Sequence, residues 1–135
     1  MDASVKEYVG FEKEKFTPLL THAQIDPHIL AVIVFGSYAR EEDYRDIDVC
    51  LFLYPDHEVK IENEARYKLK TTLALPEGFD ITFFDDLPLY IKARALKDSK
   101  ILLNKDYDTL FDIFERTIKD YDMYEPHLES LLGER

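Results

Sequence analysis

Three mostly apolar runs stand out along a chain in which charged and apolar residues otherwise alternate closely. Each has a glycine or proline beside one end, and they span Ile29–Phe35, Ile47–Tyr54 and Phe79–Phe84. Runs of this length that contain β-branched and aromatic residues are typical of buried strands. The chain therefore predicts three strands, and the short run Ile101–Leu103 is either a fourth strand or the extension of a helix.

Apolar residues recur at helical spacing between these runs. Segment 58–75 carries an apolar residue at every fourth position, which predicts one amphipathic helix with the stripe Ile61, Ala65, Leu69 and Leu73. Asp86 is a candidate N-cap for a helix that runs to about Leu96. Further helices are predicted near residues 4–20, at 37–41, and from 106 to the end, where Pro126 separates two helices.

The resulting order of elements is α-β-α-β-α-β-α-(β)-α-α. It predicts an α/β (α+β) fold in which a small mixed central sheet of three to four strands is flanked by helices, with C-terminal helices at about residues 106–133. A chain of 135 residues has the length of one domain with one core, so we expect a single domain over residues 1–135. Periodicity alone does not distinguish parallel from antiparallel strands, and the sheet polarity stays open.

Acidic residues outnumber basic ones by 28 to 17, and the formal net charge is -11 at pH 7. This charge argues against non-specific nucleic-acid binding, which relies on Lys and Arg. A nucleotide substrate remains compatible, because a bound metal can supply positive charge. No apolar run approaches the ~20 residues of a membrane span, and no secretory signal follows Met1, so we expect a cytoplasmic protein. Scarce Gln and Asn reflect either a thermophile composition or sampling in a short chain.

Two aspartates flank Ile47 at the start of the second predicted strand. Residues i and i+2 of a strand share a face, so Asp46 and Asp48 would project together while Ile47 turns into the core. Like charges this close repel each other, and a cation between them relieves the repulsion. Carboxylate oxygens suit Mg²⁺, which typically completes its shell with water and substrate phosphates. The competing interpretation is a pair of exposed strand-start or turn-capping residues.

The same Asp-x-Asp spacing occurs twice more, at residues 106–108 and 120–122. Both pairs lie in or beside predicted helices, where the side chains of residues i and i+2 diverge and cannot share a cation. We expect Asp106–Asp108 to contribute an N-cap and Asp120–Asp122 to face solvent.

A Gly-Ser pair precedes the first aspartate pair and distinguishes it from the other two. Gly36 ends a predicted strand and permits close approach of a ligand to the backbone, while Ser37 begins a short helix whose free N–H groups suit an anion. Alone, Gly-Ser usually means only a turn. Joined to Asp46 and Asp48, it predicts a site that holds a polyphosphate through metal.

A third carboxylate lies within the third predicted strand. Asp80 stands among Phe and Ile, where an unpaired charge is unfavourable, so it is either a functional carboxylate or an edge-strand residue that faces water. Asp85 and Asp86 are alternatives at the end of that strand, where helix capping is the simpler expectation.

Other reactive residues form no recognisable constellation. The four histidines have no metal-ligand spacing, and no Ser-His-Asp or Cys-His arrangement can be argued. Cys50 is the only cysteine, and its apolar neighbours predict a small core residue.

The segments "GSYAREEDYRDIDV" and "FDITFF" resemble the minimal nucleotidyltransferases of the DNA polymerase β-like superfamily. Their signature is Gly-Ser, a spacer, Asp-x-Asp and a later Asp on a strand. The resemblance covers about residues 29–103 and implies the polymerase β-like palm fold. It also implies two Mg²⁺ ions and a nucleoside triphosphate, with ATP expected, as substrate.

The resemblance assigns roles to six residues. Gly36 and Ser37 would hold the nucleotide's phosphates, and Arg40 would either reach a phosphate or form a surface ion pair. Catalysis and metal binding would fall to Asp46, Asp48 and Asp80, with Asp80 as ligand of the catalytic metal or as base. Two features depart from the pattern: the spacer has eight residues instead of ten, and Glu41 replaces a common glycine.

Family members of this size resemble the antitoxins of HEPN/MNT toxin–antitoxin pairs, which implies AMP transfer to a hydroxyl of a HEPN ribonuclease partner. An acidic surface would suit a basic partner. The apolar stripe Phe111, Phe114, Ile118, Tyr121 and Tyr124 is either core packing or a surface for a partner or a homodimer. The alternatives are a module that neutralises its partner by contact alone, a nucleotidyltransferase for a small molecule, and a metal-dependent phosphotransferase or hydrolase.

Overall fold

The computed structural model describes the backbone of residues 13–132 and the side chains of residues 14–123. Its helices and strands are α2 (Lys13–Ile25), β1 (Ile29–Phe35), α3 (Gly36–Ala39), β2 (Ile47–Leu53), α4 (His57–Lys60), α5 (Glu64–Ala74), β3 (Phe79–Phe83), the 3-10 turn η1 (Phe84–Asp86), α6 (Leu89–Lys97), β4 (Lys100–Asn104) and α7 (Tyr107–Leu132). None of these helices is long and apolar enough to cross a membrane.

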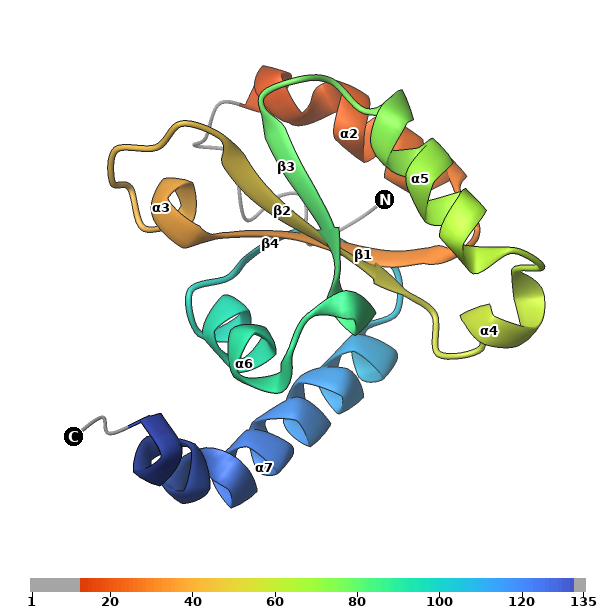
Figure 1. The fold of residues 1–135 in the computed structure, drawn as a ribbon. Helices are drawn as coiled ribbons and strands as arrows, with labels where there is room; N and C mark the ends of the chain where they lie inside the picture. Colours follow the sequence, from red (N-terminus) through yellow and green to blue (C-terminus); the bar gives the residue numbers. More distant parts are fainter. Residues whose placement is uncertain (1–12, 133–135) are drawn as a thin grey trace.

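The four strands form one mixed sheet in the order β3-β2-β1-β4 (Figure 1). β1 is antiparallel to both β2 and β4, whereas β2 and β3 are parallel. The predicted mixed sheet is therefore confirmed, and Ile101–Leu103 belongs to a fourth strand. The parallel pair is joined by a crossover through α4 and α5, as parallel strands require.

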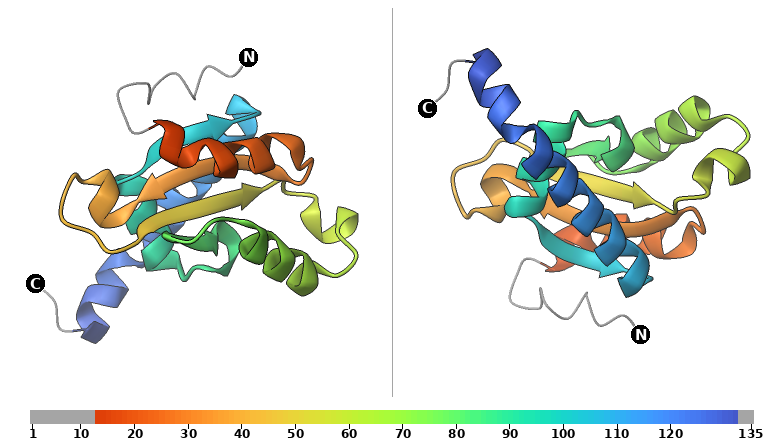
Figure 2. Two further views of the ribbon diagram at one scale, coloured as in Figure 1. Left: turned by 90° about the horizontal axis from the view of Figure 1, so that it is seen from above. Right: turned by 90° about the horizontal axis from the view of Figure 1, so that it is seen from below.

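Helices cover both faces of the sheet, with α2 and α5 on one face and α6 and α7 on the other (Figures 1 and 2). Side chains of β2 alternate between the two layers: Val49 and Leu51 pack toward α2, and Cys50 and Phe52 pack toward α6 and α7. The period of two in a strand produces this division. Ile47 and Cys50 are both core residues, as the sequence predicts.

The predicted helix 58–75 is wrong in two respects. It divides into α4 and α5, because Ile61 adopts an extended conformation and Asn63 caps α5 by accepting a hydrogen bond from the Arg66 N–H. Only Ile61 of the predicted stripe is buried, while Ala65 is exposed, Leu69 is 59% exposed and Leu73 74% exposed.

The ends and caps of three further helices can be compared with their predictions. The first helix is described only from Lys13 and extends beyond the predicted end at residue 20, while the predicted residues 4–12 lie outside the described part. Asp86 does not cap α6: Pro88 occupies the N-cap, and Asp86 accepts a hydrogen bond from Lys68. α7 continues through Pro126 as one helix, so the prediction of two helices there is wrong. Asp106 is confirmed as an N-cap, since its side chain accepts from the Thr109 N–H.

Candidate functional site

The turn from β1 into α3 brings the backbone against an aspartate of the neighbouring strand. Gly36 has a φ of 75°, a conformation that residues with a side chain rarely adopt. A Cβ at Gly36 would overlap the Asp48 carboxylate and would lie 3.3 Å from its Cγ. Glycine is therefore required here for two separate reasons, and its absent side chain leaves the space that Asp48 occupies.

Asp48 and Asp80 are direct neighbours across the parallel pair β2–β3, where their Cα atoms are register partners. Phe79, Ile81 and Phe83 pack into the α2–α5 layer, so the alternate residue Asp80 lies on the opposite face of the sheet. Asp48 lies between Ile47 and Val49, which also pack into that layer, and it faces the same way as Asp80. The sheet thus brings two predicted carboxylates together from segments 32 residues apart.

The local electrostatics favour the protonated form of Asp48. Its partial burial, the neighbouring Asp80 and then Asp46 raise the pKa of the Asp48 carboxyl, and Arg40 partly opposes this. Asp46 precedes the first residue of β2 and is exposed. Asp80 is exposed as well and stands on an edge strand, so both sequence interpretations of Asp80 hold at once: it faces water, and it adjoins Asp48.

The donor set at this edge is compatible with a hard divalent cation but does not by itself complete a site. Within the part of the chain that the structure describes, no three His, Cys, Asp or Glu side chains converge as a metal-ligand set. Mg²⁺ commonly takes one or two carboxylates and fills its remaining positions with water and substrate phosphate. The facing pair Asp48 and Asp80, with Asp46 nearby, fits that requirement.

Arg40 forms ion pairs with other residues of the chain. Its guanidinium donates to Asp98 Oδ2 at 2.9 Å and lies 3.2 Å from Glu42 Oε1. These hydrogen bonds, with Glu42 the larger, raise the pKa of Arg40. The surface ion-pair interpretation therefore describes this structure, and the contact with Asp98 joins α3 to the C-cap of α6.

The short loop after α3 contains the main departure from the family pattern. Glu41 has a φ of 62°, in the left-handed region that glycine adopts without strain. This explains the glycine that the family pattern favours at this position. Farther along the loop, Tyr44 packs edge-to-face on Tyr38 with ring centroids 4.9 Å apart, and its hydroxyl accepts a hydrogen bond from Lys15.

A large hollow lies elsewhere among the described residues. A groove of about 870 Å³ runs between α7 and the C-terminal end of β2, where Leu53, His57 and Phe84 contribute to its wall. Asp46 and Asp48 lie at the other end of the seven-residue β2, roughly 20 Å away at about 3.3 Å per residue. The grouping of carboxylates, rather than the size of a hollow, identifies the candidate site.

Residues 18–108 match the family described as "Polymerase beta, Nucleotidyltransferase". The chain belongs to this nucleotidyltransferase family. The matched span includes Gly36, Ser37, Asp46, Asp48 and Asp80, and the mixed sheet is the one expected from the family resemblance.

One sequence relative of this nucleotidyltransferase is a protein of Methanocaldococcus jannaschii named as a putative protein adenylyltransferase. The two are 28% identical over 82 residues, which cover 59% of this chain and 60% of the relative. The match thus spans somewhat under two thirds of that protein.

Solved structures extend the similarity of fold to most of the chain. A chain in the crystal structure of a toxin–antitoxin with AMP-PNP has a TM-score of 0.64 and 20% identity, covering 91% of this chain and 97% of that one. A chain in the complex of a tri-AMPylated Shewanella oneidensis HEPN toxin with MNT antitoxin has a TM-score of 0.61 and 20% identity, with 89% and 92% covered. At these identities the similarity shows the nucleotidyltransferase fold.

The structure also reveals an ionic cluster that the sequence analysis missed. Buried His57 lies between two carboxylates, with Nδ1 2.7 Å from Glu64 and Nε2 2.8 Å from Asp85. Lys68 then bridges Glu64 and Asp86 at 2.9 and 3.0 Å. The cluster fastens α4 and α5 to η1, directly after the strand that carries Asp80. Its members are too widely separated along the sequence for spacing to reveal it.

Proposed function

We propose that this nucleotidyltransferase transfers AMP from ATP to a hydroxyl group of a partner protein and thereby acts as the antitoxin of a HEPN ribonuclease. The observation that carries the proposal is the facing pair Asp48 and Asp80 beside Gly36, at the point where β1 enters α3. The family resemblance assigns catalysis to these carboxylates, and the family match over residues 18–108 spans them.

The chain's own groups suit the handling of a triphosphate. The turn at Gly36 exposes backbone without a side chain, and Ser37 in the first turn of α3 adds a hydroxyl close to it. The first N–H groups of a helix have no acceptor within the helix, so they are available to phosphate oxygens. Arg40 is the C-cap of the same short helix. If its guanidinium exchanged the contact with Glu42 for one with a phosphate, it would add a third donor to the site.

Asp46, Asp48 and Asp80 are the residues that would hold Mg²⁺. The bound metal would supply Lewis acidity for phosphoryl transfer and offset the negative charge of the substrate. Asp80 is exposed on an edge strand, so an acceptor hydroxyl can approach it from solvent and hydrogen-bond to its carboxylate. In the transfer, the acceptor oxygen bonds to the α-phosphorus and its proton passes to a base, a role that Asp80 can fill. The bond from the α-phosphorus to the oxygen that bridges to the β-phosphate breaks, and pyrophosphate leaves with that oxygen.

A protein acceptor is supported by the relatives rather than by the site alone. The Methanocaldococcus jannaschii relative is named as a putative protein adenylyltransferase, and one structural neighbour comes from a complex with an AMPylated HEPN toxin.

Transfer of label from α-labelled ATP to a co-expressed HEPN partner tests the proposal. We expect Mg²⁺-dependent labelling of the partner and its loss in Asp48→Asn, whereas Asp108→Asn, from one of the helical Asp-x-Asp pairs, should label normally. Equal labelling by Asp48→Asn and wild type would refute the assigned site. Neutralisation of the partner by an inactive variant would favour the contact-only module, and release of free AMP without an acceptor would favour a hydrolase.

A further inference from the structure

A second, smaller groove lies between α6 and α7. It has a volume of about 470 Å³, and its apolar walls come from Ala93 and Leu96 on α6 and from Phe114, Ile118 and Tyr121 on α7. Phe114 packs into the core layer beneath, but Ile118 remains 42% exposed. The predicted α7 stripe is therefore divided: Phe114 packs on the sheet, whereas Ile118 and Tyr121 line an open groove. The side chain of Tyr124 lies outside the described residues.

Two cations border this groove on the α6 side. Arg94 and Lys97 are exposed and one turn apart, and within the described residues neither side chain forms an ion pair or hydrogen bond. Other cations of the described helices are paired, as Lys68 is with Glu64 and Arg116 with Asp112. In a chain with a net charge of -11, a border of unpaired positive charge around an apolar groove marks a local preference for negative charge.

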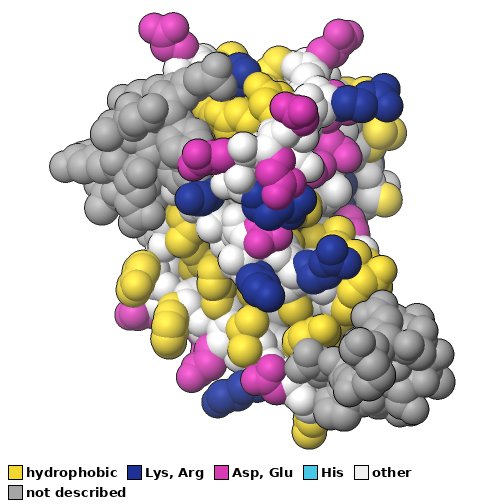
Figure 3. Space-filling model, turned by 90° about the vertical axis from the view of Figure 1, so that its left-hand side faces the viewer, with side chains coloured by type: hydrophobic (Ala, Val, Ile, Leu, Met, Phe, Trp, Pro, Cys, Tyr) yellow, Lys and Arg dark blue, Asp and Glu magenta, His cyan; other side chains and the backbone are white. Residues whose placement is uncertain are grey.

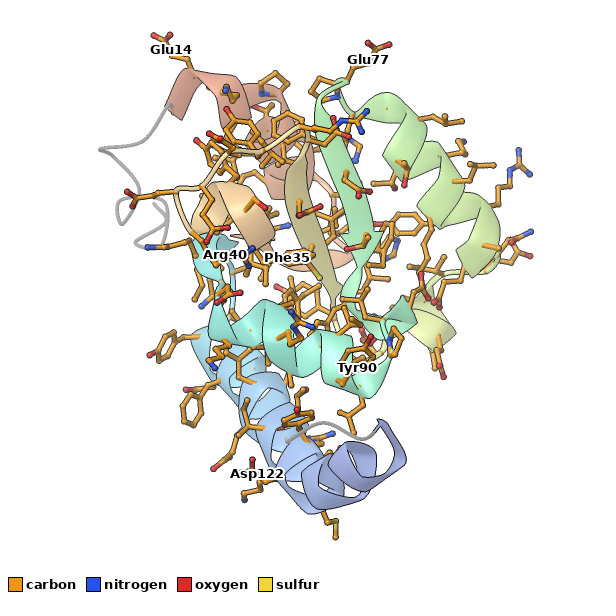
Figure 4. All side chains as sticks on the ribbon, turned by 60° about the vertical axis from the view of Figure 1, so that its left-hand side comes forward. Glu14, Phe35, Arg40, Glu77, Tyr90 and Asp122 are labelled. Carbon is orange, nitrogen blue, oxygen red and sulfur yellow. The ribbon has the colours of Figure 1, made fainter. Side chains whose placement is uncertain are left out.

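The groove lies on the same side of the sheet as the candidate active site. Asp48 and Asp80 face the α6–α7 layer, as the alternation of their strands shows. Lys97 is directly followed by Asp98, whose carboxylate accepts from Arg40 of the site. Figure 4 shows Arg40 above the C-terminal end of α6, with α7 beneath that helix. On the corresponding face of the molecule, Lys and Arg side chains gather between acidic side chains and a hydrophobic area (Figure 3).

We propose that the α6–α7 groove docks the acceptor protein through an apolar segment flanked by Asp or Glu side chains. The inference rests on the proposed function, because an acceptor hydroxyl must be held near Asp80 long enough to react. Ile118 and Tyr121 would receive the apolar side chains, and Arg94 and Lys97 would pair with the flanking carboxylates. A local basic border thus selects the partner segment, although the protein as a whole is acidic.

Binding to the HEPN partner, measured by titration with purified proteins, tests this docking surface. We expect Ile118→Asp and the double variant Arg94→Glu/Lys97→Glu each to weaken binding about tenfold or more, as charges placed in an apolar or electropositive contact do. The matched controls are Leu73→Asp and Arg66→Glu/Lys70→Glu, which make the same changes on exposed α5 positions and should bind like wild type. Increasing salt should weaken wild-type binding more than that of the charge-reversal variant.

The readouts separate this inference from the proposed function. Asp48→Asn should abolish transfer but retain partner binding, whereas the groove variants should keep their affinity for an ATP analogue and transfer label only at higher partner concentration. Wild-type partner affinity in both groove variants would overturn the docking surface and leave the proposed function standing. It would also be overturned if Ile118→Asp dissociated a homodimer of this chain without affecting the partner, since the groove would then bind a second copy. Loss of affinity in the α5 controls as well would equally refute a specific groove.

Discussion

The carboxylate of Asp48 occupies the space that a side chain at Gly36 would require. Asp48 on β2 is the register partner of Phe35, the last residue of the antiparallel strand β1, and Gly36 follows Phe35 as the first residue of α3. The Gly-Ser turn and the Asp-x-Asp motif are therefore sterically coupled: Gly36 has no side chain, and the Asp48 carboxylate occupies the space this leaves.

Gly36→Ala tests this relationship. The substitution places a Cβ at a φ of 75° and against Asp48, so we expect a loss of roughly 2–4 kcal/mol in the free energy of unfolding, from backbone strain and overpacking together. In an Asp48→Ala background only the strain of about 1–2 kcal/mol remains. Urea unfolding of the four proteins in this cycle measures the coupling, and additive losses would show that the overlap carries no energy.

Much of the fold follows from the sequence because the strands are continuous apolar runs with clear ends. β1 matches its prediction at both ends, and β2 and β3 each end one residue early. α5 was predicted less well because its inner face is partly polar: Tyr67 donates to Asp26 at 2.6 Å, and Thr71 is buried. A hydropathy pattern assigns such residues to the surface and instead buries Leu69 and Leu73.

For the candidate site, too, only part of the arrangement could be predicted from the sequence. The approach of Asp48 to Asp80 could be predicted from the motif, whereas the register that makes them direct partners depends on the parallel pairing of β2 with β3. The partner of Arg40 could not be predicted, since Asp98 is 58 residues away and its position is set by the docking of α6. Long-range ion pairs carry no periodic signal in the sequence.

Mg²⁺ should stabilise the protein through the carboxylate pair. A cation that binds only the folded state at about ten times its Kd adds about 1.4 kcal/mol to the free energy of unfolding. We expect this gain in wild type and little of it in Asp48→Asn or Asp80→Asn, while Asp108→Asn should respond normally. Thermal unfolding with and without Mg²⁺ measures it, and an undiminished gain in Asp48→Asn would place the cation elsewhere.

The raised pKa of Asp48 predicts a pH dependence of the metal-free protein. The folded state holds a proton at pH values where the unfolded chain, with an ordinary aspartate pKa of 3.8, has released it. Stability should therefore fall as pH rises through the window above 3.8, and Asp48→Asn should reduce this fall. Because the side chain is only partly buried and solvent screens its charge, we expect an effect below about 1 kcal/mol. Urea unfolding across that window measures it, and Asp122→Asn on the exposed side of α7 should leave the profile unchanged.

Replacement of Glu41 by glycine should stabilise the protein. The left-handed backbone at this position costs a residue with a side chain roughly 1 kcal/mol, which glycine avoids, although its freer unfolded state offsets part of the gain. We expect Glu41→Gly to raise the free energy of unfolding by about 0.5 kcal/mol. Glu42→Gly, at the next exposed position, serves as the control and should not stabilise. A loss of stability in Glu41→Gly would show that the Glu41 side chain makes a compensating contribution.

The ionic cluster around His57 should contribute more to stability than the surface ion pairs do. The two ring nitrogens of His57 lie 2.7 and 2.8 Å from carboxylate oxygens of Glu64 and Asp85. His57 is only 7% exposed, and its removal leaves a gap together with two carboxylates that lose a partner. We expect His57→Ala to lower the free energy of unfolding by about 2–3 kcal/mol.

The control for His57→Ala is Lys60→Ala on the same short helix. Its pair with Asp56 is exposed and 3.8 Å long, so its loss should change stability by less than about 0.5 kcal/mol. The cluster also makes stability depend on acidic pH. Hydrogen bonds from Lys68 and then His57 lower the pKa of Glu64. The stabilisation from Glu64 is therefore present above the ordinary glutamate pKa and disappears as pH falls through the lowered value. Urea unfolding of both variants at neutral and acidic pH measures these effects. Equal losses for His57→Ala and Lys60→Ala would show that the buried cluster adds nothing beyond an ordinary surface pair.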